Sequence, residues 1–315
     1  MKPYPLHKSR QAGLTLIELL VALVISSVIA LAAFSAIVVS RQGFSTVDSA
    51  SQLRDNARFA TDIIQRLSVQ TGYQDVKYAA SAASSASNTQ PPNISGFTNG
   101  TPSISGILVT STAKTASATG YGSDVLILRY QAPETYPGSG QVDKGVIDCM
   151  GNPATTISID RDDRMMSVLY VAESRGQPAL MCRTGAGAGQ PLVEGVENFQ
   201  VLYGVDGDND SVTDRYMRAD QLIVSGNEAA TKANWQMVRS IKIGLILRSN
   251  VGATQETASQ TLYPLGNARA SASAALGSAF ADAANDPGTV LVAPADRRLR
   301  LQTSFTIHLR NEQNL

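Results

Sequence analysis

The longest apolar stretch of the chain lies near its N-terminus. Residues 19–40 contain no charged side chain, and a short basic leader with Lys2, Lys8 and Arg10 precedes them. About 20 apolar residues in a helix, at ~1.5 Å per residue, span the hydrocarbon core of a bilayer. The pattern therefore predicts a helix that can cross a membrane, with the basic leader on the cytoplasmic side.

The hydrophobic pattern changes after this stretch but stays helical. Apolar residues recur in steps of three and four at Val47, Ala50, Leu53, Ala57, Ala60, Ile64 and Leu67. Charged side chains occupy the opposite faces, as expected for an amphipathic helix whose apolar stripe packs on a folded domain. Gly72 is a stop signal, so we expect the helix to end near Gln70. Gly43, a poor helix former, is a candidate for a bend between the two halves.

The rest of the chain has the patterns of β-strands. Strands are predicted from apolar alternation and β-branched content at 124–130, 166–173, 179–183, 196–205, 238–248 and 300–310. The strands at 166–173 and 179–183 form a hairpin in this prediction. Trp235 is expected to be a core anchor, and His308 falls on the outward parity of its strand.

Two tracts of small residues carry weaker signals. Residues 79–119 are rich in Ser, Ala, Thr, Gly and Asn, and we expect a mostly irregular loop with one strand at 106–110. Residues 268–284 form either a weak helix or a mobile insertion. Together the elements predict an α+β fold, in which a long N-terminal helix packs on an antiparallel sheet.

Composition narrows the class of protein. The 315 residues carry 26 basic and 26 acidic side chains. Removal of the leader, which holds three of the basic residues, changes the formal net charge to 23 − 26 = −3. A weakly acidic chain argues against nucleic acid as a partner. The two cysteines, Cys149 and Cys182, follow the apolar segment and fall in the exported part. An oxidising compartment favours a disulfide between them, and two buried thiols are the alternative.

Glu18 is the anomaly of the N-terminal helix. It follows Gly13 by five residues and is a carboxylate within an otherwise apolar segment. A lone carboxylate in a membrane is costly, so it calls for a partner. A basic leader, a glycine, an apolar helix and one early acid together make a processing signal.

This constellation closely resembles the class III signal of type IV prepilins. The resemblance implies cleavage after Gly13 by a prepilin peptidase, N-methylation of the new N-terminal Leu14, and pairing of Glu18 with the N-terminal amine of a neighbouring subunit. A buried carboxylate and ammonium stabilise each other where each alone is costly. An ordinary secretory signal peptide has a shorter apolar region of about 7–15 residues. A plain signal anchor leaves Glu18 unexplained.

Later segments resemble the minor pilin family called PilW. They are 122–130, 192–204 and the Arg297-Arg298-Leu299-Arg300 run before the last strand. They are also similar to J-type minor pseudopilins of type II secretion. The implied organisation is a leader at 1–13, a transmembrane or filament-core helix at 14–40, an amphipathic half at 41–72 and a β-rich periplasmic or extracellular domain at 73–315.

One acidic loop is a candidate metal site. Asp206, Asp208 and Asp210 alternate, and Asp214 follows. Oxygen ligands in a tight turn suit Ca²⁺. Ser211 and Met217 stand where an EF-hand loop needs glycine and glutamate, so a full EF-hand is excluded and a shorter Ca²⁺ loop remains. The alternative is a turn held by local hydrogen bonds. No cofactor is required.

The sequence gives little support for catalysis. His308 is the only histidine after the leader, so no Ser-His-Asp set can be drawn. The 160–164 segment fits a charged turn, and the glycines at 185–189 lack the Lys-Ser/Thr ending of a phosphate loop. We therefore expect no enzyme.

The prepilin resemblance makes assembly the first functional hypothesis. It implies a minor pilin in a complex that primes type IV pilus assembly near the tip, upstream of twitching motility or adhesion. The implied partners are the prepilin peptidase, other minor pilins, the major pilin and a tip adhesin. The chain would reside in the inner membrane as a single-pass protein and later in the pilus at the cell surface. Alternatives are a J-type pseudopilin and a binding module at the filament tip.

Overall fold

The computed structural model describes residues 13, 15–75, 90–267, 287–311 and 313. The chain divides into two units, Met1–Asp48 and Ser49–Leu315. The helix α1 (Leu16–Gln70) contributes to both, since its residues 16–48 belong to the first unit and 49–70 to the second. The helix is continuous through Gly43, and the bend considered at that glycine stays a prediction.

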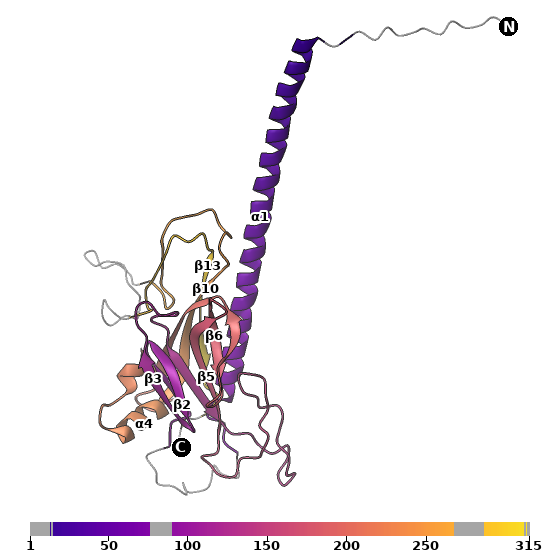
Figure 1. Cartoon of the computed structure of the whole chain (residues 1–315). Coiled ribbons are helices and arrows are strands. Elements are labelled where there is room, and N and C mark those ends of the chain that lie inside the picture. Colours follow the sequence, from indigo (N-terminus) through magenta and orange to yellow (C-terminus); the bar gives the residue numbers. More distant parts are fainter. Residues whose placement is uncertain (1–12, 14, 76–89, 268–286, 312, 314–315) are drawn as a thin grey trace, which may run out of the picture. The chain divides into compact units, whose positions relative to one another are not determined.

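All the strands of the described residues lie in the second unit (Figure 1). They are β1 (Ile94–Phe97), β2 (Gly100–Ser105), β3 (Leu108–Ala113), β4 (Val125–Tyr130), β5 (Met165–Ser174), β6 (Gln177–Arg183), β7 (Gln190–Glu194), β8 (Val196–Val205), β9 (Arg215–Met217), β10 (Val238–Arg248), β11 (Gln260–Leu262), β12 (Leu291–Ala293) and β13 (Arg300–His308). Two short helices, α3 (Ala219–Leu222) and α4 (Glu228–Gln236), lie between β9 and β10.

The strands form two larger antiparallel sheets. One has the order β1-β4-β5-β6-β7, and the other has the order β13-β10-β8-β9. In the second sheet Phe199 of β8 lies opposite Leu245, and Ile243 of β10 lies opposite Phe305. The amide of Asp124, just before β4, donates to the carbonyl of Phe199 at 2.8 Å and ties the two sheets together. The α+β class with an antiparallel sheet is confirmed.

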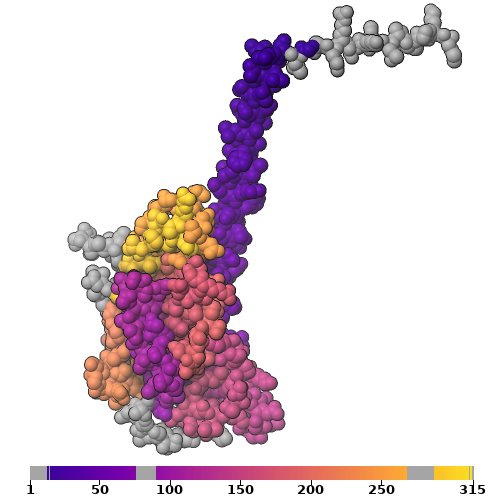
Figure 2. Space-filling view, in the orientation of Figure 1, coloured from indigo at the N-terminus to yellow at the C-terminus, as the bar shows by residue number. Residues whose placement is uncertain are grey.

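Strand β4 explains how the domain is layered. All six of its residues are buried, because both faces of its sheet are covered. Successive side chains of a strand point to opposite faces. Leu126 and Leu128 belong to the main core with α1, whereas Val125 and Ile127 belong to a second core beneath the hairpin β2–β3. Figure 2 shows this hairpin on the surface of the domain.

The second half of α1 packs its predicted stripe into the main core. Leu53, Ala57, Ala60, Ile64 and Leu67 are buried there, as the three-and-four spacing predicted. Val47, the first position of that stripe, lies in the other unit and is exposed, so packing begins further along the helix than expected.

The predicted end of the helix is also confirmed. The helix stops at Gln70, and Gly72 takes the left-handed conformation, with φ of 75°. This conformation is readily accessible to glycine and ends helices. The amide of Gly72 then donates to the carbonyl of Arg129 at 2.9 Å, which turns the chain toward β4.

The prediction of a mostly irregular loop at 79–119 is wrong for much of the range that the structure describes, because β1, β2 and β3 lie there. The single strand expected at 106–110 is also misplaced. Gly106, with φ of 60°, and Ile107 form the hairpin turn, and β3 starts at Leu108. The buried positions of β2 are Gly100, Pro102 and Ile104, so only one of three carries a strongly apolar side chain. The sequence of β2 therefore does not show the alternation of apolar and polar residues that would have predicted a strand.

The other predicted strands occur within a few residues of their expected bounds, and 196–205 and 238–248 match fully. The short elements β7, β9, β11, β12, α3 and α4 were not predicted. Trp235 is buried in α4, with its ring 4.7 Å from that of Tyr203, which confirms it as a core anchor. The tract at 268–284 lies outside the described residues.

Ile64→Ala should lower the free energy of unfolding by about 2–3 kcal/mol, because it leaves a cavity at a fully buried position. Phe59→Ala, on the exposed side of the same helix, is the matched control, and about 0.5 kcal/mol or less is expected. Urea unfolding of the detergent-solubilised chain measures both. Equal losses for the two variants would contradict the packing of this stripe.

Candidate functional site

Glu18 has a partner within its own chain. Its Oε2 accepts hydrogen bonds from the backbone amide and the hydroxyl of Thr15, both at 2.9 Å. The Thr15 hydroxyl oxygen in turn accepts from the amide of Glu18 at 3.3 Å. This reciprocal arrangement at the start of α1 is a capping box, which satisfies donors left free in the first helical turn.

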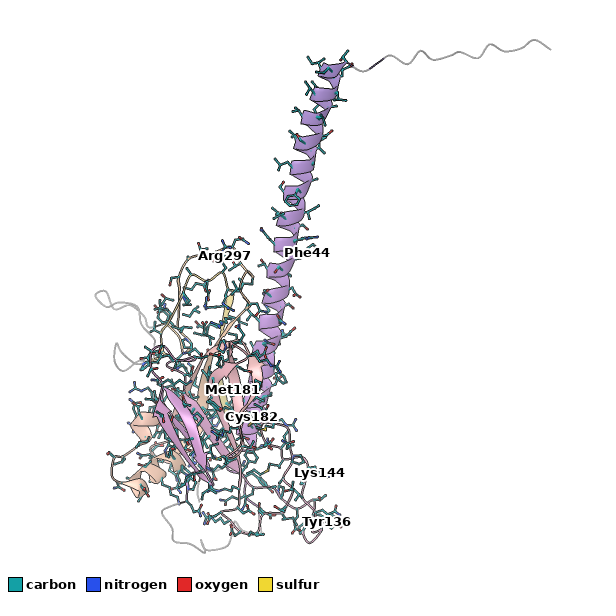
Figure 3. The ribbon with its side chains drawn as sticks, viewed as in Figure 1. Phe44, Tyr136, Lys144, Met181, Cys182 and Arg297 are labelled. Atoms are coloured by element: carbon teal, nitrogen blue, oxygen red, sulfur yellow. A yellow bond between two sulfur atoms is a disulfide. The ribbon has the colours of Figure 1, made fainter. Side chains whose placement is uncertain are left out.

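In the first unit, the described side chains are uncovered over nearly the whole length of the helix. Every described residue from position 15 to 45 is exposed, including the large apolar side chains of 16–44. Within the described residues, α1 is the one helix long and apolar enough to cross a membrane by length and composition. Figure 3 marks Phe44 near the end of this exposed stretch.

The predicted processing residues are only partly covered by the structure. Gly13 is described and precedes α1, and no described residue other than its chain neighbours comes within 4 Å of the place where a side chain on it would begin. Leu14 and the basic leader lie outside the described residues. The cleavage and methylation expected here stay predictions.

The acidic loop brings three of its four predicted ligands together. Asp206, Asp208 and Asp210 can each place a carboxylate oxygen within 4.8 Å of the others. Asp206 is buried, and its Oδ2 accepts from the Ser211 amide at 2.9 Å and from Arg239 Nε at 3.2 Å. Burial raises the pKa of Asp206, but hydrogen bonds from Arg239 and from the backbone amides of Ser211 and its neighbours together outweigh burial, and the net pKa is lowered.

The fourth predicted ligand has a different role. Asp214 accepts from the amide of Gly207 at 2.6 Å, which closes the loop. Asp208 and Asp210 remain exposed, and the charge of Asp210 raises the pKa of Asp208. The loop therefore has local hydrogen bonds of the kind expected for a turn, together with a repulsive carboxylate pair that a cation would relieve.

The two cysteines form the expected disulfide. Cys149 and Cys182 are bonded, with their Cα atoms 5.8 Å apart and a separation of 33 positions in sequence. Cys182 lies on β6, and Cys149 lies in the long 131–164 connection between β4 and β5. Figure 3 shows Cys182 inside the domain and labels Tyr136 and Lys144 on this connection.

The segments weighed as catalytic motifs have ordinary structural roles. His308 is exposed on β13. The Oδ1 atom of Asp160 accepts from the amides of Asp162 and Asp163, both at 2.8 Å, which makes the 160–164 segment the charged turn that was predicted. The glycines at 185–189 connect two strands and do not open a helix.

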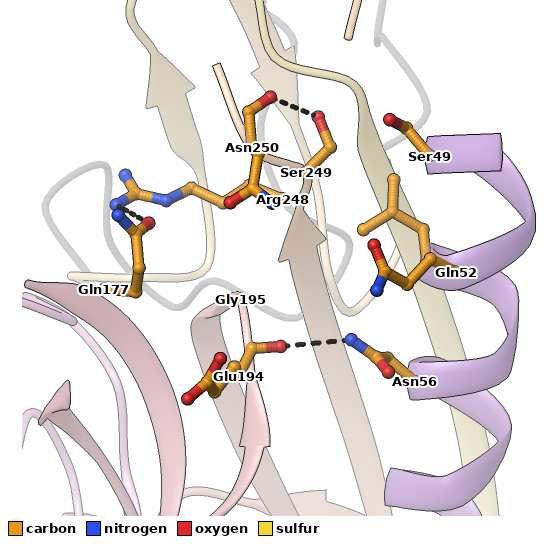
Figure 4. A pocket seen from close by; sticks show the side chains of 10 residues that line it. Ser49, Gln52, Asn56, Gln177, Glu194, Gly195, Arg248, Ser249 and Asn250 are labelled. Atoms are coloured by element: carbon orange, nitrogen blue, oxygen red, sulfur yellow. Dashed lines mark hydrogen bonds between the residues drawn. The ribbon is translucent and has the colours of Figure 1, made fainter. Parts of the chain in front are cut away.

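A small polar hollow lies where α1 meets the ends of several strands (Figure 4). Its volume is about 90 Å³, and Asn56 of α1 donates across it to the carbonyl of Glu194 at 3.4 Å. Arg248 donates to the Gln177 side chain at 3.3 Å on the other side. A hollow of this size has room for a few water molecules.

Sequence reasoning missed two features. The Thr15-x-x-Glu18 spacing is itself the signal of a capping box, yet Glu18 was considered only as an unpaired acid. The buried guanidinium of Arg129 was also missed. Its signal was a charged residue near the end of a strand that is otherwise continuously apolar.

Comparison with known families matches two parts of the chain. A family model described as type IV pilus-assembly protein W matches residues 168–311. A model of the prokaryotic N-terminal methylation motif matches residues 8–34, which include Gly13, Leu14 and Glu18. The comparison with curated proteins found no match.

A solved structure also resembles this chain. It is a type IV-like pilin from Thermus thermophilus, with 12% sequence identity and a TM-score of 0.36. The match covers 83% of this chain and 99% of that one.

Proposed function

We propose that this chain, a minor pilin of the type IV pilus-assembly protein W family, joins other minor pilins in a complex that primes pilus assembly near the filament tip. Its part in type IV pilus assembly follows from the family and from the methylation motif. The place in a priming complex, and twitching motility or adhesion as the downstream process, are the proposal.

The observation that carries this proposal is the uncovered apolar helix. Residues 16–44 expose Leu, Ile, Val and Phe side chains that no described residue covers. In water, large contiguous apolar surfaces mark an interaction with lipid or with another protein. A membrane covers this surface before assembly, and the helices of neighbouring subunits cover it in the filament.

Glu18 supplies the assembly contact in this proposal. Its Oε2 is bonded to Thr15, whereas no described residue bonds to its Oε1. The free oxygen and the negative charge can therefore meet the N-terminal ammonium of a neighbouring subunit. In an apolar surrounding, the pair avoids the high cost of two separate charges.

The motif and the apolar helix fit anchoring in a membrane. We further propose a single-pass inner-membrane protein with a cytoplasmic N-terminus, cut by prepilin peptidase and then moved to the pilus. The positive charges of Lys2, Lys8 and Arg10 support this orientation. The major pilin, other minor pilins and a tip adhesin are the proposed partners, and no catalytic step is part of the function.

Gly13→Leu should block processing, because the peptidase is expected to cut directly after Gly13. Mass spectrometry of the chain isolated from membranes should then find the full-length form only. Gly43→Leu, at a second glycine of the N-terminal unit, is the control and should be cut normally. Normal maturation of the Gly13 variant would place the cleavage site elsewhere.

A deletion strain separates the pilus from the alternatives. Loss of twitching with normal enzyme secretion is the expected result. Loss of secretion with normal twitching would favour a J-type pseudopilin, and loss of surface attachment with normal filament numbers would favour a binding module at the tip. Normal behaviour in all three assays would contradict a role in filament assembly.

We also propose that the acidic loop binds Ca²⁺ weakly through Asp206, Asp208 and Asp210. The crowded carboxylates support this proposal, and Arg239 competes with the cation for Asp206. Titration calorimetry of the full chain with CaCl₂ should show binding in the millimolar range, and Asp208→Asn should weaken it. Absence of heat and of any thermal shift at millimolar Ca²⁺ would remove the proposal.

A further inference from the structure

Two arginines line the same small hollow in the domain. Arg129 is the fifth residue of β4 and is 3% exposed, and Arg164 lies one residue before β5. The hollow has a volume of about 150 Å³, and Ile107, Asp162 and Met166 also line it. A charged group this buried needs a partner that compensates for its lost hydration.

The partners of both guanidinium groups are neutral. Arg129 donates from Nη1 to the Pro92 carbonyl at 2.9 Å and to the Ser95 hydroxyl at 3.3 Å, and from Nη2 to the Ile107 carbonyl at 3.2 Å. Arg164 donates from Nη1 to the Asn93 side-chain oxygen at 2.6 Å, and from Nη2 to the Pro91 carbonyl at 2.9 Å.

Each arginine keeps a buried donor without a partner. The Nε atoms of Arg129 and Arg164 are enclosed, and neither has a hydrogen bond in this structure. Arg183, the last residue of β6, offers a contrast. Its Nε and both Nη atoms all donate to backbone carbonyls. Carbonyls can therefore satisfy a guanidinium in this domain, and at Arg129 and Arg164 they do so only in part.

No ion pair within the described part of the chain balances the positive charges of Arg129 and Arg164. Burial, together with the charge of Arg164, lowers the pKa of Arg129 to about 9. Asp162 lines the hollow and attracts Arg164 only from beyond ion-pair distance. The preceding segment 76–89 contains no Asp or Glu in its sequence.

We propose that this hollow binds a small dissolved oxyanion, of the carboxylate or sulfate class, between Arg129 and Arg164. The guanidinium group suits such anions, because it carries a permanent positive charge and several N–H donors in one plane. A hollow of about 150 Å³ can hold one molecule about the size of benzene and is too small for a chain segment. The inference is independent of the role in pilus assembly.

Thermal unfolding of the full, detergent-solubilised chain tests this site. Sodium acetate and sodium sulfate are compared with sodium chloride at the same ionic strength. At least one of the two should raise Tm by about 2–4 °C more than chloride does, because a ligand that binds the native state stabilises it. Sulfate also stabilises proteins by exclusion from their surface. Comparison of the wild type with variants of the hollow therefore distinguishes specific binding from this general effect.

Arg164→Gln should remove this extra rise, and Arg183→Gln should retain it. Both variants lose one positive charge and one guanidinium, but only the first alters the hollow. Asp162→Asn should increase the rise and tighten binding several-fold, because it removes a competing negative charge from the lining. If Arg164→Gln does not fold, Arg164→Lys keeps the charge without the planar guanidinium and should also lose the rise.

Three outcomes would overturn the proposal. The first is no extra rise in the wild type with either salt. The second is an equal rise in the wild type and the Arg164 variants, which would show a general salt effect. The third is a smaller rise in Asp162→Asn, which would make Asp162 the counter-ion of the arginine pair and leave no place for a dissolved anion.

Discussion

Glu18→Ala is expected to be cleaved normally and to reach filaments at less than a tenth of the wild-type level. Its carboxylate has two tasks in our account: it caps α1 together with Thr15, and it pairs with the N-terminal ammonium of a neighbour. Breaking a buried ion pair costs about 3–5 kcal/mol, whereas losing a helix cap costs about 1 kcal/mol. Each 1.4 kcal/mol is a factor of about ten, so the pair dominates.

Two further variants separate these tasks. Glu18→Gln keeps the capping box, which accepts either Glu or Gln, but it removes the charge. Thr15→Ala removes the hydroxyl of the box and keeps the charge. We expect Glu18→Gln to fail nearly as fully as Glu18→Ala, and Thr15→Ala to lose only a few-fold. Immunoblots of sheared filaments against total processed protein measure all three.

The outcome that contradicts the pairing is specific. If Glu18→Gln enters filaments like the wild type while Glu18→Ala does not, the acid serves only as a helix cap. If both variants enter normally, Glu18 has no role in assembly at all. Either result would leave the family match intact but would remove the proposed contact between subunits.

Removal of the disulfide should produce the largest loss of stability in the β-domain. The double variant Cys149→Ala/Cys182→Ala should lower the free energy of unfolding by about 3–4 kcal/mol, because the bond restricts a loop of about 30 residues in the unfolded chain. The bond also ties the 131–164 connection to β6. Urea unfolding under oxidising conditions measures the difference.

Reduction of the wild type provides the matched control for this variant. A reducing agent should lower the stability of the wild type to nearly that of the double variant and leave the variant unchanged. A loss below about 1 kcal/mol would show that the connection is held by its other contacts. Those contacts include the hydrogen bond from the Tyr130 hydroxyl to the Ile147 carbonyl at 2.9 Å.

The long elements of this fold could be predicted because their hydrophobic patterns are sustained. In α1, seven apolar positions at helical spacing pointed to the stripe, and five of them are buried in the main core. In β8 and β10, alternation over ten or more residues gave the strand bounds directly. Long periodic segments average out local exceptions, so their type is readily recognised.

The short elements could not be predicted because packing, rather than pattern, determines them. Strand β2 buries Gly100 and Pro102, whose side chains carry little apolar signal. Strands β9, β11 and β12 have three residues each, which is too few to show a period. The covering of β1 by α3 and α4 depends on contacts between segments more than 100 positions apart in sequence.

Of the residues discussed as functional, some could be predicted from the sequence and others could not. The residue types around Gly13 and Glu18 pointed to processing and assembly, and the methylation-motif match covers them. The local role of Thr15 was readable from its spacing but was overlooked. The meeting of Arg129 and Arg164 was beyond the reach of the sequence, because it depends on the register that brings β4 and the start of β5 together.

Mass spectrometry of sheared, washed filaments tests the central claim most directly. Our account predicts a low-abundance N-terminal peptide that begins at methylated Leu14 and contains Glu18, with no leader residues attached. The peptide should disappear from filaments of a strain that carries Gly13→Leu. Recovery of the chain only from membranes, in either form, while filaments contain none of it, would contradict its incorporation as a minor pilin.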